Sequence, residues 1–280
     1  MPLTTTSLTT GVNSMIAQTT SDWGTCKPGY LQTIAMDLGQ RKRLKKIRGW
    51  LRRNSPTAEA YDVMRRGLRF RCYVHDNITE RNLAYGGRGD NGEELDLIER
   101  HLPVGGTFVD VGANCGLFSL VAAQRVGRSG RVIAIEPNPT LIDRLRFNVK
   151  ANGFDLDIVQ CAVSDVEGVG ELTLCNRNLG QSGLTTLMPG PAIKVPTRSL
   201  CSVLAEKGIS RIDAMKIDIE GLEDRAIMPL LRSAPEALWP AAILIEVVLG
   251  FMWREGCIVA LQDRGYRIAW RSAKDVLLMR

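Results

Sequence analysis

The stretch that decides the fold is FVDVGANCGLFSLVAAQRVGRSGRVIAIEPNP, which runs from Phe108 to Pro139. An apolar run is followed by a glycine-spaced loop, a helical pattern and a second apolar run that ends in Glu136. A strand, a helix and a strand in this order form the unit of a parallel sheet, in which ligands bind at the carboxyl ends of the strands. A ligand is therefore expected at the loop between Asp110 and Gly116.

Strands and helices alternate along the chain after Thr107. Further apolar segments at 131–136, 156–163, 212–220 and 241–248 are expected strands, with helical patterns between them. They are apolar on both faces, which is typical of a parallel sheet with helices on each side. The segments 266–271 and 275–280 lie close together and predict a hairpin. The sequence thus predicts an α/β fold with a doubly wound, mostly parallel sheet and an antiparallel last strand.

The chain divides into three parts. Residues 1–40, which begin rich in serine and threonine, are expected to be a flexible tail. Residues 41–104 are expected to hold a basic helix and a lid, with a helix over 57–66, a strand over 69–74, and a loop and helix that Asn91 caps. Residues 105–280 form the α/β domain.

The positive charge of the protein is concentrated in the segment 41–53. The net charge is +6, yet this segment holds eight basic residues and no acidic one, which leaves 28 basic and 30 acidic residues elsewhere. Its apolar residues have helical spacing, so it predicts a basic amphipathic helix. Such a helix could contact an anionic membrane surface or an acidic substrate, or pack on its own domain. No nucleic-acid partner is expected, because no basic surface interleaved with aromatic residues appears elsewhere.

The seven cysteines are scattered and show no metal-ligand spacing, which predicts a reduced, cytoplasmic protein, and no residue is assigned to a metal. The first residues lack the pattern of a signal peptide, and no run of 18 apolar residues predicts a membrane span. Membrane association is expected only through segment 41–53.

Glycine spacing separates two classes of cofactor at the first loop. A dinucleotide fingerprint starting at Gly112 requires glycines at 114 and 117, where the chain has Asn114 and Leu117. A carboxylate at Asp110 also suits a cationic ligand better than a pyrophosphate. S-adenosylmethionine carries an ammonium and a sulfonium and no phosphate, so it is the predicted cofactor.

The remaining cofactor contacts follow from the places of the residues in the sheet. Glu136 is expected to accept the ribose hydroxyls, and Gly112 and Gly116 are expected to let the ligand lie against the backbone. The predicted cofactor-binding residues are Asp110, Gly112, Ala113, Asn114, Gly116, Glu136, Pro137, Asn138, Ala162 and Asp165.

Several motifs resemble the FkbM family of class I S-adenosylmethionine-dependent methyltransferases. They are DVGANCGLFSL (110–120), EPNP (136–139), CAVSDVEG (161–168), KVPTRSL (194–200), IDAMKIDIEGLEDRAI (212–227) and LIEV (244–247). The resemblance covers roughly residues 85–280, and Cys201 departs from it, since the family commonly has aspartate there. It implies a seven-stranded Rossmann-like sheet, S-adenosylmethionine as cofactor, and O-methylation, often of sugar or polyketide hydroxyls.

The segment MKIDIEG places three charged residues, Lys216, Asp218 and Glu220, on one face of an expected strand. We expect Asp218 or Glu220 to act as the catalytic base, while Lys216 lowers their proton affinity or holds the deprotonated acceptor. The alternative is an ion pair that only anchors the strand. His75, Glu246 and Trp253 are weaker candidates for contacting the substrate. The loop 178–190 is either a substrate-facing flap or a plain surface loop.

The sequence therefore predicts an O-methyltransferase that acts on a hydroxyl of a sugar, a glycolipid or another natural product. A nicotinamide-dependent oxidoreductase is disfavoured by the glycine spacing. A non-catalytic, cofactor-binding scaffold has no need of Lys216, Asp218 and Glu220.

Overall fold

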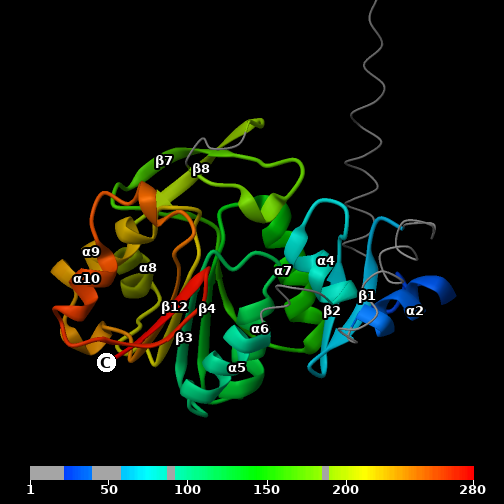
Figure 1. Ribbon diagram of the computed structural model, residues 1–280, viewed down its shortest axis with the longest axis horizontal. Coiled ribbons are helices and arrows are strands. Elements are labelled where there is room, and N and C mark those ends of the chain that lie inside the picture. The colour runs from blue at the N-terminus through cyan, green and yellow to red at the C-terminus, as the bar shows by residue number, and fades with distance from the viewer. Residues whose placement is uncertain (1–21, 40–57, 87–91, 185–188) are drawn as a thin grey trace, which may run out of the picture.

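The computed structural model describes residues 22–39, 58–86, 92–184 and 189–280, and its centre is a seven-stranded sheet (Figure 1). The strand order is β11-β12-β10-β9-β3-β4-β5. The strands are β3 (Thr107–Val111), β4 (Arg131–Ile135), β5 (Asp157–Val159), β9 (Ala214–Ile217), β10 (Ala242–Glu246), β11 (Arg267–Arg271) and β12 (Asp275–Met279).

The strand order reverses in the middle of this sheet. The chain runs outward from β3 through β4 to β5, and then returns to add β9 and β10 on the other side of β3. These five strands are parallel, whereas β12 is antiparallel to both β10 and β11. The predicted doubly wound sheet and its antiparallel last strand are confirmed. The reversal places the carboxyl ends of β3 and β9 side by side.

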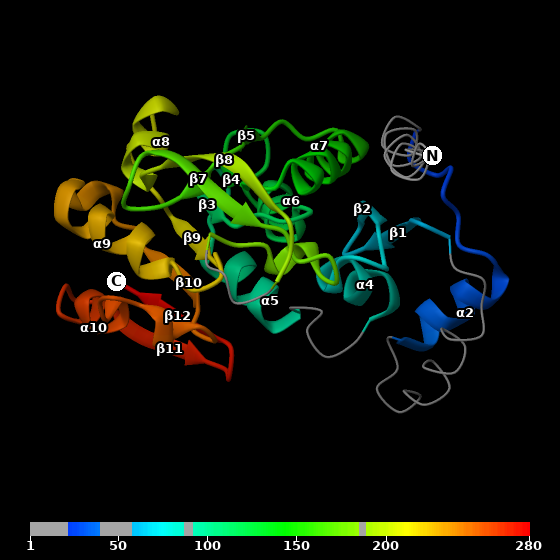
Figure 2. The ribbon, with the colours of Figure 1, turned by 90° about the horizontal axis from the view of Figure 1, so that it is seen from above.

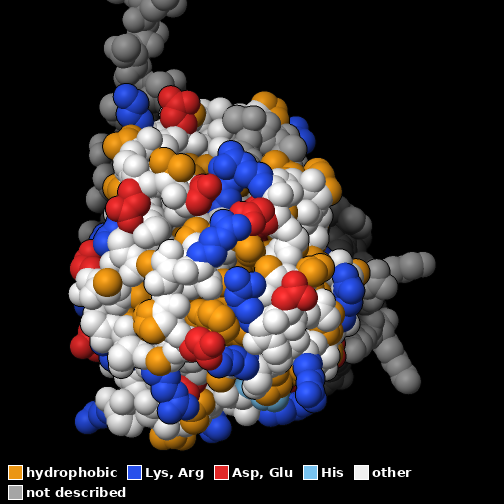
Figure 3. All heavy atoms as spheres, turned by 90° about the vertical axis from the view of Figure 1, so that its left-hand side faces the viewer, with side chains coloured by type: hydrophobic (Ala, Val, Ile, Leu, Met, Phe, Trp, Pro, Cys, Tyr) orange, Lys and Arg blue, Asp and Glu red, His pale blue; other side chains and the backbone are white. Residues whose placement is uncertain are grey.

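Helices cover both faces of the sheet, which explains why its strands are apolar on both sides (Figure 1). The sheet separates two hydrophobic cores, one on each face. Alternate residues of β3 point into different cores, since Phe108 packs in one and Val109 in the other. The first face carries α5 (Gly92–His101), α6 (Leu117–Val126) and α7 (Pro139–Asn152), and the second carries α8 (Leu200–Glu206), α9 (Glu223–Ser233) and α10 (Cys257–Gln262). The outer surface over α8, α9 and α10 mixes basic and acidic side chains (Figure 3).

A second, three-stranded sheet lies above the main one (Figures 1 and 2). It consists of β6 (Ala162–Val163), β7 (Gly168–Thr173) and β8 (Ala192–Arg198). The single strand predicted over 156–163 is wrong, because β5 ends at Val159 and β6 pairs with β8 instead of with β4. This departure carries the chain over the carboxyl edge of the main sheet.

The N-terminal block, residues 58–86, packs beside α7 and differs from the prediction (Figure 1). The helix predicted over 57–66 is wrong. Residues there form β1 (Tyr61–Arg65), which pairs with β2 (Leu68–Cys72) in a hairpin. Arg66 and Gly67 both have positive φ, 52° and 76°, which is the two-residue turn that suits a hairpin. The alternation of buried Tyr61 and Val63 outweighs the helical reading of the same residues.

Two further helices were not predicted. The helix α2 (Tyr30–Gly39), with Ala35 and Met36 buried, replaces part of the flexible tail expected over 1–40, and α4 (Ile78–Tyr85) follows the hairpin. The basic segment 41–53 and the predicted cap Asn91 lie outside the described residues. Among the helices that the structure describes, none combines the length and the apolar character that crossing a bilayer requires.

Candidate functional site

A cavity opens at the carboxyl edge of the main sheet, where the strand order reverses. Ligands of doubly wound sheets bind at this place. Its wall combines the first loop, the ends of β4 and β6, the loop after β7 and the segment after β9. The polar and apolar residues of this wall include Thr79, Gly112, Ala113, Asn114, Glu136, Pro137, Ala162, Leu179, Gly180, Leu184, Lys216, Asp218 and Glu220.

Close packing requires glycine at two positions of the first loop. Gly112 and Gly116 have φ of 82° and 91°, a region that glycine adopts without strain. A Cβ on Gly112 would lie 1.9 Å from the carbonyl oxygen of Asp218, and one on Gly116 would lie 2.4 Å from Leu145. Gly112 still lies on the cavity wall, but Gly116 does not. Both glycines bring the loop close to its neighbours.

Glu136 lies on the cavity wall with its carboxylate oriented by the backbone. It is only 6% exposed, and it accepts hydrogen bonds from the N–H groups of Asn114 and Asn138, each at 2.9 Å. Burial raises the pKa of Glu136 to about 7, although those two backbone bonds oppose the shift. This placement at the end of β4 agrees with the predicted ribose acceptor.

Besides Gly116, three of the predicted cofactor residues lie off the wall. Asp110 is fully buried, because its side chain points toward α6 and accepts a hydrogen bond of 2.6 Å from the Ser119 hydroxyl. Burial also raises the pKa of Asp110. Asn138 instead caps α7 by accepting from Thr140 N–H, and Asp165 contacts Ser164 and Arg254. The direct contact predicted for Asp110 is therefore not supported.

Lys216 joins the first loop to the segment after β9. Its ammonium donates to the carbonyl oxygen of Gly112 at 3.0 Å and lies 3.1 Å from the Asp218 carboxylate. The strand β9 ends at Ile217, so Asp218 and Glu220 lie on a loop and not on the strand face that was predicted. Glu220 has a φ of 56°, which turns the chain there. All three charged side chains nevertheless line the cavity.

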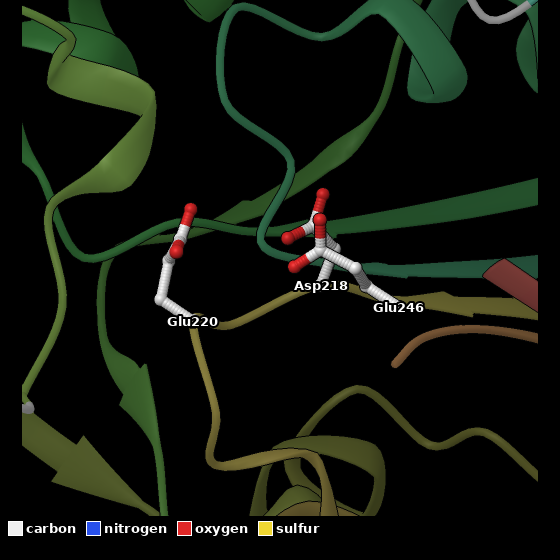
Figure 4. A group of neighbouring side chains, drawn as sticks. All are labelled: Asp218, Glu220 and Glu246. Carbon is white, nitrogen blue, oxygen red and sulfur yellow. The ribbon is translucent and has the colours of Figure 1, made fainter. Parts of the chain in front are cut away.

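Glu246, at the end of β10, completes a group of three carboxyls with Asp218 and Glu220 (Figure 4). One oxygen of each lies within 4.8 Å of the others. Burial, and then Asp218, raise the pKa of Glu220 to about 8 and that of Glu246 to about 10. Lys216 only partly opposes these shifts, contrary to the expectation for Glu220. Carboxyl groups so close together could attract a cation, but Lys216 already supplies positive charge here, and we assign no metal.

The other substrate candidates are placed less favourably. His75 is exposed, and its Nε2 lies 3.1 Å from the carbonyl oxygen of Ala58. The indole of Trp253 donates to Glu223 at 2.7 Å and so anchors a loop. Neither residue lines the cavity.

Two parts of the site were not identified from the sequence. The buried Glu223 accepts from the N–H groups of Ile219 and Gly221 and so holds the loop that carries Glu220. An acidic residue in the first turn of a helix after a glycine was the available signal. Thr79 of the N-terminal block also lies on the wall. Five residues of the loop 178–190 contribute to the wall, which favours the flap over a plain surface loop: Leu179, Gly180, Ser182, Gly183 and Leu184.

The variant Glu246→Gln is expected to lose less stability than the wild type as the pH rises. The folded-state pKa of about 10 exceeds the usual value of 4.5, so between these values the folded protein holds more protons than the unfolded one. Stability therefore falls as pH rises across this window, and glutamine removes that contribution. Thermal melts at pH 5 and pH 9 should show the variant gaining about 2–4 °C relative to wild type at the higher pH. An equal difference at both pH values would contradict the assignment.

Sequence comparisons relate this chain to known methyltransferases. Residues 110–268 match the family model described as the Methyltransferase FkbM domain. The protein named Methyltransferase sdnD, from Sordaria araneosa, is 28% identical over 208 residues, which are 60% of this chain and 76% of that protein. The 31-O-demethyl-FK506 methyltransferase FkbM of Streptomyces tacrolimicus is 31% identical over 167 residues, 49% of this chain and 62% of that protein.

A solved structure is similar to this chain at a lower sequence identity. The tRNA (uracil-54, C5)-methyltransferase of Pyrococcus abyssi, in complex with S-adenosyl-L-homocysteine, superimposes with a TM-score of 0.46 and 14% identity. The match covers 80% of this chain and 44% of that one.

Proposed function

The chain belongs to the FkbM methyltransferase family, and on this premise we propose that it methylates a hydroxyl group of a sugar, a glycolipid or another natural product. Its methyl donor is S-adenosylmethionine. The hydroxyl assignment rests on one observation: the carboxyl group of Glu220 lies on the cavity wall, and its pKa is raised to about 8. A neutral hydroxyl is a weak nucleophile, and a base with a pKa near the working pH is the group it requires.

The cavity suits the donor in shape and in chemistry. The ends of β4 and β6 offer an apolar surface at Ile135, Ala162 and Val163, on which a purine ring can lie. Glu136 stands beside this surface as a hydrogen-bond acceptor for ribose hydroxyls. The carboxyl group of Asp218 also lies on the cavity wall, where it is paired with Lys216 at 3.1 Å. We propose that Ala113, Asn114 and Pro137 complete this part of the wall.

In the proposed reaction the acceptor hydroxyl lies against Glu220. When bound, S-adenosylmethionine supplies the methyl group. Glu220 accepts the hydroxyl proton, and Lys216 stabilises the negative charge that develops on the acceptor oxygen. Asp218, paired with Lys216 at 3.1 Å and sharing a hydrogen bond with Glu246, holds the lysine ammonium at the cavity wall. Positioning supplies most of the rate, because the reaction is a direct displacement that needs alignment of the reactants.

The name of one relative supports a hydroxyl acceptor. The Streptomyces tacrolimicus protein is named for 31-O-demethyl-FK506, the O-demethyl form of a natural product. The test is mass spectrometry after incubation with S-adenosylmethionine and a panel of glycans, lipid-linked sugars, polyketides and amine-bearing analogues. We expect products heavier by one CH₂ unit with the methyl group on oxygen. Methylation confined to nitrogen in the amine-bearing members would contradict the proposal.

Glu136→Ala is expected to weaken S-adenosylhomocysteine binding by about 10- to 100-fold, the range for losing hydrogen bonds to a charged group. The carboxylate is held by two backbone N–H groups and faces the cavity, so its loss removes the ribose acceptor. Isothermal titration calorimetry measures the affinity. Glu171→Ala, an exposed carboxylate on β7, is the matched control and should bind as wild type does. Unchanged affinity in Glu136→Ala would contradict the placement of the cofactor ribose at this end of the cavity.

A further inference from the structure

We propose that Asn77 is a positioning residue for the cofactor loop, which it holds through the side chain of Asn114. Asn77 belongs to the N-terminal block and lies outside residues 110–268, the part that matches the family model. The proposal rests on the cofactor placement given above. It makes the N-terminal block a fixed part of the cofactor site, where the sequence predicted only a lid.

The side chain of Asn77 uses both ends of its amide. It is 1% exposed, and its Nδ2 donates to Asn114 Oδ1 at 2.7 Å. Its Oδ1 accepts from the N–H of Glu80 at 3.2 Å and so caps α4. A buried amide with both ends bonded has one orientation, and this orientation directs the donor at the loop.

Asn114 transmits the contact to Glu136. It has a φ of 53°, a left-handed conformation that is uncommon for residues other than glycine. Its Oδ1 also accepts from Cys115 N–H at 2.8 Å, and its own N–H donates to Glu136 Oε2 at 2.9 Å. A hydrogen-bonded chain therefore runs from Asn77 through Asn114 to the carboxylate that we assign to the ribose. Loss of the first bond frees the residue that orients this carboxylate.

The segment that carries Asn77 is itself anchored. The Arg144 guanidinium from α7 pairs with Asp76 at 2.7 Å and with Glu80 at 2.6 Å, and it lies 4.0 Å from the centre of the Tyr73 ring. Arg144 and Glu80 are almost completely buried. Such a bidentate, buried arrangement favours a single position of the segment.

The loop after β7 is attached to the same segment. Asn178 Oδ1 accepts from Ile78 N–H at 2.9 Å, and Leu179 N–H donates to the carbonyl oxygen of Asp76 at 2.6 Å. The start of α4 thus lies between the first loop and this second loop, and Thr79 reaches the cavity between them. The segment that carries Asn77 is therefore bonded to both loops, each of which contributes residues to the cavity wall.

The test uses Asn77→Asp and Asn77→Ser in the full-length protein, with S-adenosylhomocysteine as the probe. Both variants retain a good helix cap. Aspartate has no donor and places an acceptor against the oxygen of Asn114, whereas serine has a hydroxyl donor on a side chain one atom too short to replace the 2.7 Å bond to Asn114. We expect affinity by calorimetry to fall about tenfold for each, which corresponds to about 1.4 kcal/mol. The KM for S-adenosylmethionine should rise while the KM for the acceptor stays unchanged, a division that general loosening of the fold does not produce.

Two further variants separate positioning from structural support. Asn152→Asp is the matched control, because Asn152 also joins the N-terminal block to α7, through Arg69, without touching the first loop. It should bind the probe as wild type does. On an Asn114→Ala background, Asn77→Ser should cause no further loss, because its effect passes through Asn114. Wild-type affinity in both Asn77 variants, an equal loss in Asn152→Asp, or losses that add to that of Asn114→Ala would each overturn the proposal. A wild-type protein that does not bind the probe would overturn the cofactor placement as well.

Discussion

Glu220→Gln is expected to lower kcat by about 10²- to 10⁴-fold, the usual contribution of a general base. Glutamine has the same shape but cannot accept the hydroxyl proton of the acceptor. Affinity for S-adenosylhomocysteine should stay close to that of wild type, because Glu220 lies on the loop after β9, away from the assigned ribose acceptor Glu136. Steady-state kinetics and calorimetry on the same preparation separate the two effects.

The pH dependence of kcat provides a second readout of the same prediction. Burial and the neighbouring Asp218 raise the pKa of Glu220 to about 8, so the proton-accepting form increases up to that pH. The kcat of wild type should therefore rise from pH 6 and level off above about pH 8, and the variant should lack this rise.

Two neighbouring variants act as controls for the base. Glu246→Gln should retain most of the activity at neutral pH, because Glu246, with a pKa raised to about 10, is already protonated there. Asp218→Asn should reduce kcat less than Glu220→Gln does, since Asp218 is engaged with Lys216. If Asp218→Asn abolished turnover while Glu220→Gln remained active, Asp218 would be the base.

Arg144→Met is expected to destabilise the protein by about 3–5 kcal/mol, the cost of removing one partner from a buried ion pair. Arg144 pairs with Asp76 and Glu80, and its side chain and that of Glu80 are 1% and 0% exposed. Methionine fills much of the volume but leaves the buried Glu80 carboxyl without its cation. Thermal or urea unfolding should register a melting temperature lower by roughly 10 °C.

Arg146→Met is the matched control on the same helix. Arg146 pairs with Asp143 at 3.5 Å, and both side chains are more than half exposed. Exposed pairs of this kind contribute about 0–1 kcal/mol, so the variant should unfold close to wild type. A melting temperature for Arg144→Met equal to that of Arg146→Met would show that the N-terminal block is not anchored as described.

Much of the α/β domain could be predicted from the sequence because the relevant signals are local. The alternation of apolar runs and helical patterns from Thr107 onward predicted the parallel sheet and its antiparallel last strand. The D-x-G-x-N-x-G spacing from Asp110 and the acidic residue at the end of the next strand located the cavity and Glu136. These features depend on neighbours along the chain, whose spacing is visible in the sequence.

The errors lie where a residue's role depends on contacts with distant parts of the chain. The helix predicted over 57–66 is a strand, because β1 gains its stability from pairing with β2 and packing in the core. Gly116 was assigned to the cofactor, but its missing side chain makes room for Leu145 of α7. Asp110 was also assigned there, although its side chain points toward Ser119.

The sequence by itself determined the fold class, the family motifs and the residue types available for chemistry, because periodicity and spacing are properties of the chain. Only the tertiary structure decided which of these residues meet. It joined Glu246 to Asp218 and Glu220, whose mutual proximity and burial raise the pKa of two of the three carboxyls. It also brought Asn77 within hydrogen-bonding distance of Asn114. Side-chain direction and long-range packing set such contacts, and neither can be read from local spacing.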